Sequence, residues 1–158
     1  NDKKFNIVEV EKEVVRKSKV MLEEKKVKIE FNLSEEINVF ADDFYMDQIL
    51  TNYITNAIKY STEVNGKRRI SIENEIMKDK NKVRVKVFNT FTGFSDEEML
   101  RIWNRFYKAD ESRKREKGGN GIGLSLVKAI MNNYGNEYGV KNVAGGVEFY
   151  FDIDYKEK

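Results

Sequence analysis

The 158-residue sequence contains no cysteine and no histidine. Without cysteine, neither a disulfide framework nor a thiolate metal site can form. Without histidine, any mechanism that needs an imidazole base, nucleophile or metal ligand must take that group from elsewhere. The sequence also has no hydrophobic run long enough to span a membrane and no signal peptide, so we expect a soluble fragment that makes no direct membrane contact.

Positive and negative charges nearly balance in this sequence. Its 29 Lys and Arg residues face 27 Asp and Glu residues, and the resulting net charge of +2 is too small to argue for a nucleic-acid partner. Hydrophobic residues make up 40% of the chain, which is enough for a sizeable core. We expect residues 1–158 to form a single domain. Because the chain begins with Asn1 rather than Met, we also expect it to be a piece of a longer protein.

Hydrophobic periodicity predicts an alternation of strands and helices. Helices are predicted at residues 11–24, 43–60, 95–105 and 121–133, and the third has a capping box formed by Ser95 and Glu98. Strands are predicted at residues 5–10, 27–33, 37–41, 70–76, 83–87 and 147–155, with a polar, mobile loop at 108–120. Strand pairs joined by short turns favour a mixed, mostly antiparallel sheet. The predicted fold class is α/β, a two-layer sandwich with helices on one face of the sheet.

The predicted helix at 43–60 carries a polar stripe opposite its apolar face, made of Gln48, Asn52, Asn56 and Lys59, with Tyr60 beside it. Asparagine is a poor residue inside a helix. Two asparagines four residues apart present two carbonyl oxygens in one direction, which suits Mg²⁺, and the lysine one turn later could reach a phosphate. From spacing alone, a solvated helix face is the interpretation that we favour, and the cation site is the alternative.

A glycine-rich segment, GGNGIGL at residues 118–124, follows the polar loop and opens the last helix. Glycines let backbone N–H groups approach an anion, and a helix N-terminus adds a favourable dipole. The segment is not a dinucleotide fingerprint, because no strand directly precedes it, and it is not a Walker loop. Alone it indicates either a phosphate-binding loop or a flexible hinge; together with the asparagine stripe it favours phosphate.

These segments resemble, in the right order, the motifs of the histidine-kinase branch of the GHKL ATPases. Residues 47–61, DQILTNYITNAIKYS, look like the asparagine box of that family, and residues 102–110, IWNRFYKAD, look like its phenylalanine box. Residues 119–124 are similar to its second glycine box, and residues 145–151, GGVEFYF, resemble its closing strand. The likeness is strongest to sensor kinases of Gram-positive bacteria. It implies the catalytic ATP-binding domain of a bacterial sensor histidine kinase, with a mobile ATP lid.

The resemblance implies a role for each matching residue. Asn56, with Asn52, would bind Mg²⁺ on the nucleotide phosphates, Lys59 would contact the phosphates, and Tyr60 would stack against adenine. Of these, Asn52 and Lys59 are the residues expected to serve catalysis. The remaining residues implied in ATP binding are the lid anchor Phe106 and its neighbour Lys108, the glycine-box residues Gly119, Gly121, Ile122, Gly123 and Leu124, and the adenine-side residues Asn89, Phe91, Gly93 and Phe94.

Position 52 distinguishes a kinase from a hydrolase within this family. The hydrolytic members place a Glu one helical turn before the metal-binding Asn, where it activates water. Asn52 stands there instead, and an amide cannot act as a general base. The resemblance therefore implies phosphoryl transfer to an external nucleophile, a histidine on a separate helical domain.

One segment departs from the family pattern. The family's first glycine box reads Asp-x-Gly-x-Gly, with the Asp binding the adenine amino group, whereas the aligned residues 89–93 read NTFTG. Asn89 can still accept a hydrogen bond, although without charge assistance. Phe91 places a large ring where the family has only backbone, so it could close or occupy the adenine pocket.

Three hypotheses follow. The first is a working kinase domain that phosphorylates a histidine on the dimerisation domain of its own parent, which would be anchored in the cell membrane, with this domain in the cytoplasm and a response regulator as partner. The second is a degenerate module with weak or lost ATP binding and a regulatory or scaffolding role. The third is a free-standing serine kinase of the anti-sigma type, against which the phenylalanine box argues. We rank them in that order.

Overall fold

The computed structural model describes residues 1–31, 33, 35–104 and 123–157. Its helices are α1 (Ile7–Lys17), α2 (Lys19–Lys25), α3 (Asp43–Tyr60), α4 (Asp96–Arg101) and α6 (Gly123–Tyr134). Its strands are β1 (Lys3–Asn6), β2 (Lys28–Phe31), β3 (Asn38–Ala41), β4 (Arg69–Met77), β5 (Lys82–Thr90), β6 (Tyr138–Val143) and β7 (Gly146–Tyr155). The predicted residues 43–60 match the bounds of α3.

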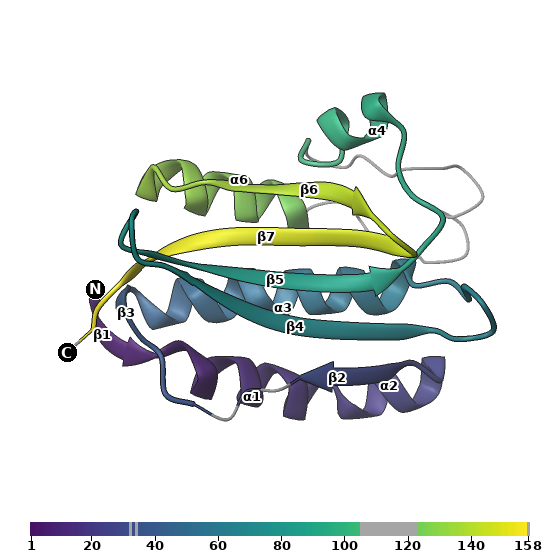
Figure 1. The fold of residues 1–158 in the computed structure, drawn as a ribbon, viewed down its shortest axis with the longest axis horizontal. Coiled ribbons are helices and arrows are strands. Elements are labelled where there is room, and N and C mark those ends of the chain that lie inside the picture. Colours follow the sequence, from purple (N-terminus) through teal and green to yellow (C-terminus); the bar gives the residue numbers. More distant parts are fainter. Residues whose placement is uncertain (32, 34, 105–122, 158) are drawn as a thin grey trace.

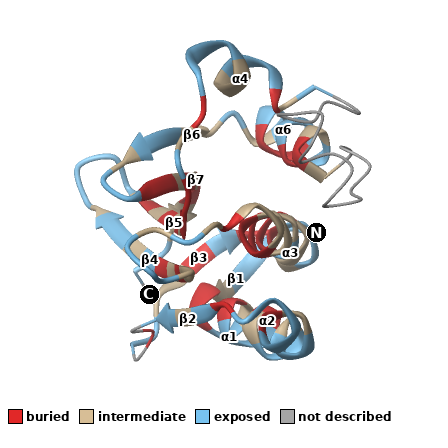
Figure 2. Ribbon diagram, turned by 90° about the vertical axis from the view of Figure 1, so that its right-hand side faces the viewer, coloured by how far each residue is buried: buried red, intermediate tan, exposed pale blue. Residues whose placement is uncertain are grey.

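The strands form one sheet of seven strands in the order β1-β3-β7-β5-β4-β2, with β6 paired to β7. In the described part of the chain only β2 and β4 pair in parallel; all other paired strands are antiparallel. The helices α1, α3 and α6 lie on one face of this sheet (Figure 1), and the view along the layers separates strands from helices (Figure 2). The predicted two-layer sandwich with a mostly antiparallel sheet is therefore confirmed.

The core lies between the sheet and the helices. Alternate residues of β5, Val83, Val85 and Val87, are fully buried, because successive side chains of a strand point to opposite faces. The buried residues of α3 are Met46, Ile49, Leu50, Tyr53, Ile54, Ala57 and Ile58. Such burial of apolar side chains is the main source of stability in the domain.

Tyr53 fixes α3 to the middle of the sheet. Its hydroxyl donates a hydrogen bond to the carbonyl of Tyr150 on β7 over 2.9 Å. Its ring packs against Phe149 and Phe151, with centroids 5.4 and 5.9 Å away. Burial raises the pKa of the Tyr53 hydroxyl well above its usual value, so the group remains a hydrogen-bond donor at neutral pH. The polar stripe of α3 is thereby held at a fixed position over the sheet.

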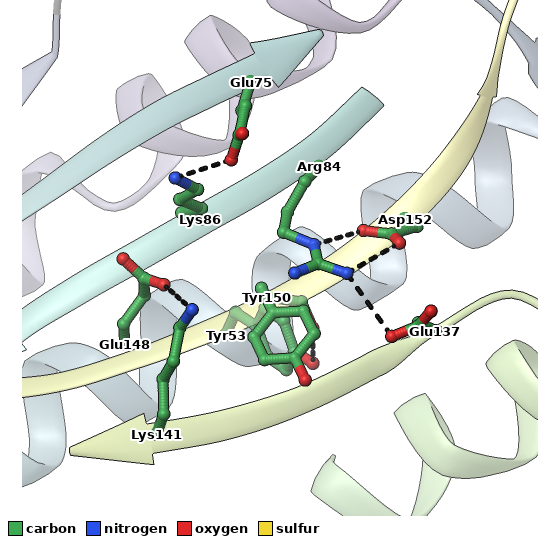
Figure 3. Close-up of polar contacts among 9 residues, drawn as sticks. All are labelled: Tyr53, Glu75, Arg84, Lys86, Glu137, Lys141, Glu148, Tyr150 and Asp152. Carbon is green, nitrogen blue, oxygen red and sulfur yellow. Dashed lines mark hydrogen bonds and ion pairs between the residues drawn. The ribbon is translucent and has the colours of Figure 1, made fainter. Parts of the chain in front are cut away.

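The opposite face of the sheet carries ion pairs in place of helices (Figure 3). Arg84 on β5 contacts both carboxylate oxygens of Asp152 on β7, at 2.7 and 3.0 Å. Its guanidinium also lies 3.5 Å from Glu137 and 4.4 Å from the ring centroid of Tyr150. The hydrogen bond to Asp152 raises the pKa of Arg84 further. Two more ion pairs join neighbouring strands, Lys86–Glu75 at 2.9 Å and Lys141–Glu148 at 3.6 Å.

The prediction of a strand over residues 5–10 was wrong beyond Asn6. A helix begins at Ile7, because the Asn6 side chain accepts a hydrogen bond from the backbone N–H of Val8 over 3.1 Å and caps the helix. The same oxygen accepts from the N–H of Ile37 at 3.0 Å. The spacing of Phe5 and Ile7, and of Val8 and Val10, fits a strand. Ile7 and Val8, however, form the buried face of α1 together with Val14.

Two predicted helices also differ from the structure. The helix expected at 11–24 is divided at Ser18, whose hydroxyl donates to the carbonyl of Val14 over 2.8 Å. The helix expected at 95–105 ends at Arg101. Its predicted capping box is confirmed: Ser95 accepts from the N–H of Glu98 at 3.1 Å, and the Ser95 N–H donates to the Glu98 carboxylate at 2.9 Å.

Candidate functional site

The polar stripe of α3 borders the start of α6. A Cβ placed on Gly123 would lie 2.7 Å from Asn52 Oδ1 and 3.7 Å from Asn56 Nδ2. The Asn52 amide is oriented by its Nδ2, which donates to the carbonyl of Gln48 over 2.9 Å. Its carbonyl oxygen therefore stands beside the backbone of Gly123. The first residue of α6 therefore lies beside the polar stripe of α3.

This arrangement brings together chemistry that suits a phosphate with a cation. Asn52 and Asn56 are half-buried on successive turns, and amide oxygens are ligands that Mg²⁺ accepts. The N-terminus of α6 carries a partial positive charge, which favours an anion. Lys59, half-buried in the last turn of α3, adds a full positive charge one turn beyond Asn56. This region thus offers oxygen ligands, one cationic side chain and a helix N-terminus.

Three aromatic rings cluster where α3 ends. Phe91 is 2% exposed, and its ring centroid lies 4.9 Å from that of Phe94 and 6.5 Å from that of Tyr60. Tyr60 and Phe94 also meet edge to face at 6.4 Å. Phe91 therefore takes part in an apolar cluster with the ring that the resemblance assigns to adenine stacking. The ring that replaces the family glycine points into the domain and not into solvent.

The segment after β5 is fixed by a residue that the sequence analysis missed. The Asn142 side chain accepts from the N–H of Phe94 at 2.9 Å and donates to the Phe94 carbonyl at 2.8 Å. Gly93, which directly precedes Phe94, has a φ of +112°. A Cβ on Gly93 would lie 3.3 Å from Asn142 Oδ1. Glycine is the residue that adopts this conformation without strain. Because Asn142 is 48 residues away from Phe94, no local sequence pattern could have identified it.

Two buried oxygens near this cluster have no hydrogen-bond partner among the described residues. They are Asn89 Oδ1, on a side chain that is completely buried, and Thr62 Oγ1. Both residues are tied to the carbonyl of Thr90: Asn89 Nδ2 donates to it at 3.1 Å and the Thr62 N–H at 2.9 Å. Buried polar atoms normally have partners. An exocyclic amino group, such as that of adenine, would supply one. The sequence analysis predicted Asn89 here and missed Thr62.

The predicted site residues fall into two groups. Phe106, Lys108, Gly119, Gly121 and Ile122 lie outside the described residues, as does the predicted loop at 108–120. The described ones, all in or beside α3, α6 and the end of β5, are Asn52, Asn56, Lys59, Tyr60, Asn89, Phe91, Gly93, Phe94, Gly123 and Leu124. Leu124 is buried in the core.

Residues 41–157 match the family described as histidine kinase-, DNA gyrase B- and HSP90-like ATPases. The chain belongs to this ATPase family. The sensor histidine kinase GacS of Pseudomonas protegens is 32% identical over 119 residues, which cover 75% of this chain and 13% of that protein. The sensor histidine kinase WalK of Bacillus subtilis is 29% identical over 140 residues, covering 87% of this chain and 22% of that protein. The chain thus spans less than a quarter of either relative.

Solved structures of this ATPase family give the same architecture. The catalytic domain of the histidine kinase ThkA superposes with a TM-score of 0.81 at 27% identity, covering 98% of this chain and 95% of that one. ThkA in complex with the response regulator protein TrrA superposes with a TM-score of 0.74 at 25% identity, covering 98% of this chain and 42% of that one. The fold is that of a histidine kinase catalytic domain. None of the described helices is long and apolar enough to cross a membrane.

Proposed function

We propose that this domain binds ATP with Mg²⁺ and donates the γ-phosphoryl group to a histidine on a separate helical dimerisation domain of a two-component sensor kinase. The observation that carries the proposal is the contact between the first residue of α6, Gly123, and the amide oxygen of Asn52. It sets a helix N-terminus against oxygen ligands, which is the chemistry needed for a metal-bound phosphate chain. The kinase names of the matched relatives support it over the degenerate module.

In this proposal the chain's residues position the nucleotide and neutralise its charge. Asn52 and Asn56 would hold Mg²⁺ through their amide oxygens, and Lys59 would contact the phosphates. Asn89 Oδ1 and Thr62 Oγ1 accept hydrogen bonds from the adenine amino group, which satisfies two buried oxygens. Mg²⁺ supplies the further positive charge that phosphoryl transfer requires.

The phosphoryl acceptor must come from outside this chain. The sequence has no histidine, and Asn52 is an amide that cannot activate water as a general base. In the transfer, the bond between the γ-phosphorus and the bridging oxygen breaks, ADP leaves with that electron pair, and an imidazole nitrogen forms the new bond to phosphorus. The relatives' names and the ThkA–TrrA complex support a sensor-kinase parent with a response regulator as its partner. We further propose that this parent is anchored in a membrane.

Labelling in trans tests this proposal. The domain is incubated with γ-labelled ATP, Mg²⁺ and the histidine-bearing helical domain of its parent. We expect acid-labile, base-stable label on the helical domain, and none when its histidine is replaced by Gln. Label on Ser or Thr of this chain alone would favour the serine-kinase hypothesis. Failure to bind ATP at millimolar concentration would favour the degenerate module.

A further inference from the structure

A carboxyl group is buried in the apolar face of α1. Glu11 is 0% exposed, and it shares this face with Ile7, Val8 and Val14, which are all at most 2% exposed. The face packs toward the sheet and α3 (Figure 2). An ionised carboxylate taken out of water without a partner is one of the least favourable groups that a fold can bury. The position therefore requires a compensating arrangement.

The only described group that bonds Glu11 is the amide of Asn74 on β4. Asn74 Nδ2 donates to Glu11 Oε1 over 2.8 Å. Asn74 occupies a position of β4 that faces the helices, in register with the buried Val85 of β5 and between Ile72 and Ile76. The sequence analysis noted that Asn74 interrupts the apolar alternation of this strand. Its partner, 63 residues earlier in the chain, accounts for the interruption.

The remaining oxygen of each group, Glu11 Oε2 and Asn74 Oδ1, is buried without a partner among the described residues. Both are acceptors if the carboxyl is ionised, so they cannot satisfy each other. A proton on Oε2 changes this, because a carboxylic acid and a primary amide each offer one donor and one acceptor side by side. The O–H of Glu11 can then donate to Asn74 Oδ1 while Oε1 accepts from Nδ2.

We infer that Glu11 is protonated in the folded domain and forms a reciprocal two-bond pair with Asn74, and that loss of this proton loosens α1 from β4. The pair joins the first helix to the sheet through hydrogen bonds in an otherwise apolar interface. Ionisation would break the O–H bond and leave a buried charge facing an amide oxygen. The hydrogen-bonded contact between α1 and the sheet is thus sensitive to pH.

Among the residues that the structure describes, no charged side chain provides Glu11 with a counter-ion. On α1 itself, Lys12 lies 4.0 Å from Glu9, and Arg16 binds Glu13. On α3, Asp47 pairs with Lys17. The outer side of β4 carries Glu73 and Glu75, and the side of β5 away from the helices carries Lys82, Arg84 and Lys86. A cavity of about 450 Å³ beside Asn74 is lined by Glu35 and Glu73, and none of its lining residues is basic.

The direction of the pH effect follows from the pKa shift of the Glu11 carboxyl. Burial raises the pKa of Glu11 to about 7, and the hydrogen bond from Asn74 lowers it in part. In the unfolded chain, the Glu11 carboxyl has its ordinary pKa of 4.5. Between pH 4.5 and 7, the folded state therefore keeps a proton on Glu11 that the unfolded state has released. This contribution to stability is fully present below pH 4.5 and is lost as pH rises through 7.

The absence of histidine makes this effect measurable, because no side chain of the chain ordinarily titrates between pH 5 and 7.5. Urea unfolding is measured over this range for the wild type, for Glu11→Gln, and for the control Glu13→Gln, an exposed residue of the same helix. Gln keeps the donor and acceptor of the protonated acid. As pH rises over this range, we expect the unfolding equilibrium constants of the wild type and of Glu13→Gln to increase roughly ten- to a hundredfold more than that of Glu11→Gln. Parallel pH profiles of wild type and Glu11→Gln would overturn the inference.

Two measurements on the wild type need no variant. A ¹³C NMR titration of the Glu11 carboxyl should have its midpoint near pH 7, and a midpoint near 4.5 would overturn the inference. Hydrogen exchange, corrected for its intrinsic pH dependence, should show α1 losing protection before α3 as pH rises to 7.5. Equal protection of both helices across this range would contradict the loosening of α1. None of these readouts depends on nucleotide, so they are independent of the proposed kinase function.

Discussion

The backbone of Gly123 lies so close to Asn52 that a methyl group at position 123 would lie 2.7 Å from the side-chain oxygen Oδ1 of Asn52. Because Asn52 Nδ2 is bonded to the carbonyl of Gln48, the amide cannot move away without losing that bond. Glycine at the first position of α6 therefore allows the start of this helix to approach the polar stripe of α3.

Gly123→Ala should weaken nucleotide binding without unfolding the domain. The methyl group would turn Asn52 aside, so we expect affinity for an ATP analogue to fall roughly three- to tenfold, or about 0.7–1.4 kcal/mol. The unfolding free energy should change by less than about 1 kcal/mol, since alanine favours the helix. Calorimetric titration checks this, with Asn133→Ala, exposed on the same helix, as control. Undiminished affinity would mean that the contact has no part in binding.

Asn56→Asp should alter metal dependence more than fold. Asn56 lies off the buried face of α3, and a carboxylate offers Mg²⁺ a charged oxygen in place of a neutral one. We expect the Mg²⁺ concentration for half-maximal nucleotide binding to change at least about fivefold, with a stability change below about 1 kcal/mol. The control is Thr51→Ala, an exposed residue of the same helix. An unchanged Mg²⁺ requirement would remove Asn56 from the proposed metal site.

Phe91→Gly should strengthen nucleotide binding while it destabilises the domain. The buried ring of Phe91 packs on Phe94 and Tyr60, and if ATP must displace it, exposing the ring costs about 1.5–3 kcal/mol, or one to two decades of affinity. Removing the ring should also cost about 3–5 kcal/mol of stability.

Calorimetry on wild type, Phe91→Gly and the intermediate Phe91→Leu measures both effects of this ring. The leucine variant keeps an apolar side chain and separates pocket volume from loss of core. Equal or weaker binding by the glycine variant would show that Phe91 is no obstacle to ATP.

The ion pair between Arg84 and Asp152 should act as a unit. The Asp152 side chain is 4% exposed, so Arg84→Met would leave a buried carboxylate and cost about 2–4 kcal/mol of unfolding free energy. The double variant Arg84→Met/Asp152→Leu should regain a large part of that loss. Urea unfolding of the two single variants and the double variant measures the coupling, and strictly additive losses would refute it.

The sequence was sufficient where local chemistry decides structure. In α3, apolar spacing gave both bounds, and in α4 the capping box identified Ser95 as the N-cap. The sequence was not sufficient where a contact with a distant residue determines the structure. Asn6 ends β1 and caps α1 while also bonding Ile37, 31 residues away, and Asn74 faces the core because of Glu11.

The same distinction applies to the candidate site. The stripe on α3 has a helical period, so spacing placed Asn52 and Asn56 on one polar face. Spacing alone favoured a solvated face, and the resemblance supplied their roles and that of Asn89. Thr62 and Asn142 could not be predicted, because one follows a helix and the other lies on a strand without any motif. Their significance appears only when the fold brings them to Thr90 and Phe94.

The most direct test of the account is an NMR titration of the ¹⁵N-labelled domain with a non-hydrolysable ATP analogue, with and without Mg²⁺. We expect Mg²⁺-dependent shifts at the side-chain amides of Asn52 and Asn56, and adenine-dependent shifts at the Asn89 side chain. The outer face of the sheet has its own groove of about 850 Å³, lined by residues that include Arg69, Lys86 and Phe88. Shifts confined to that groove, or no shifts at millimolar analogue, would contradict a nucleotide site between α3 and α6.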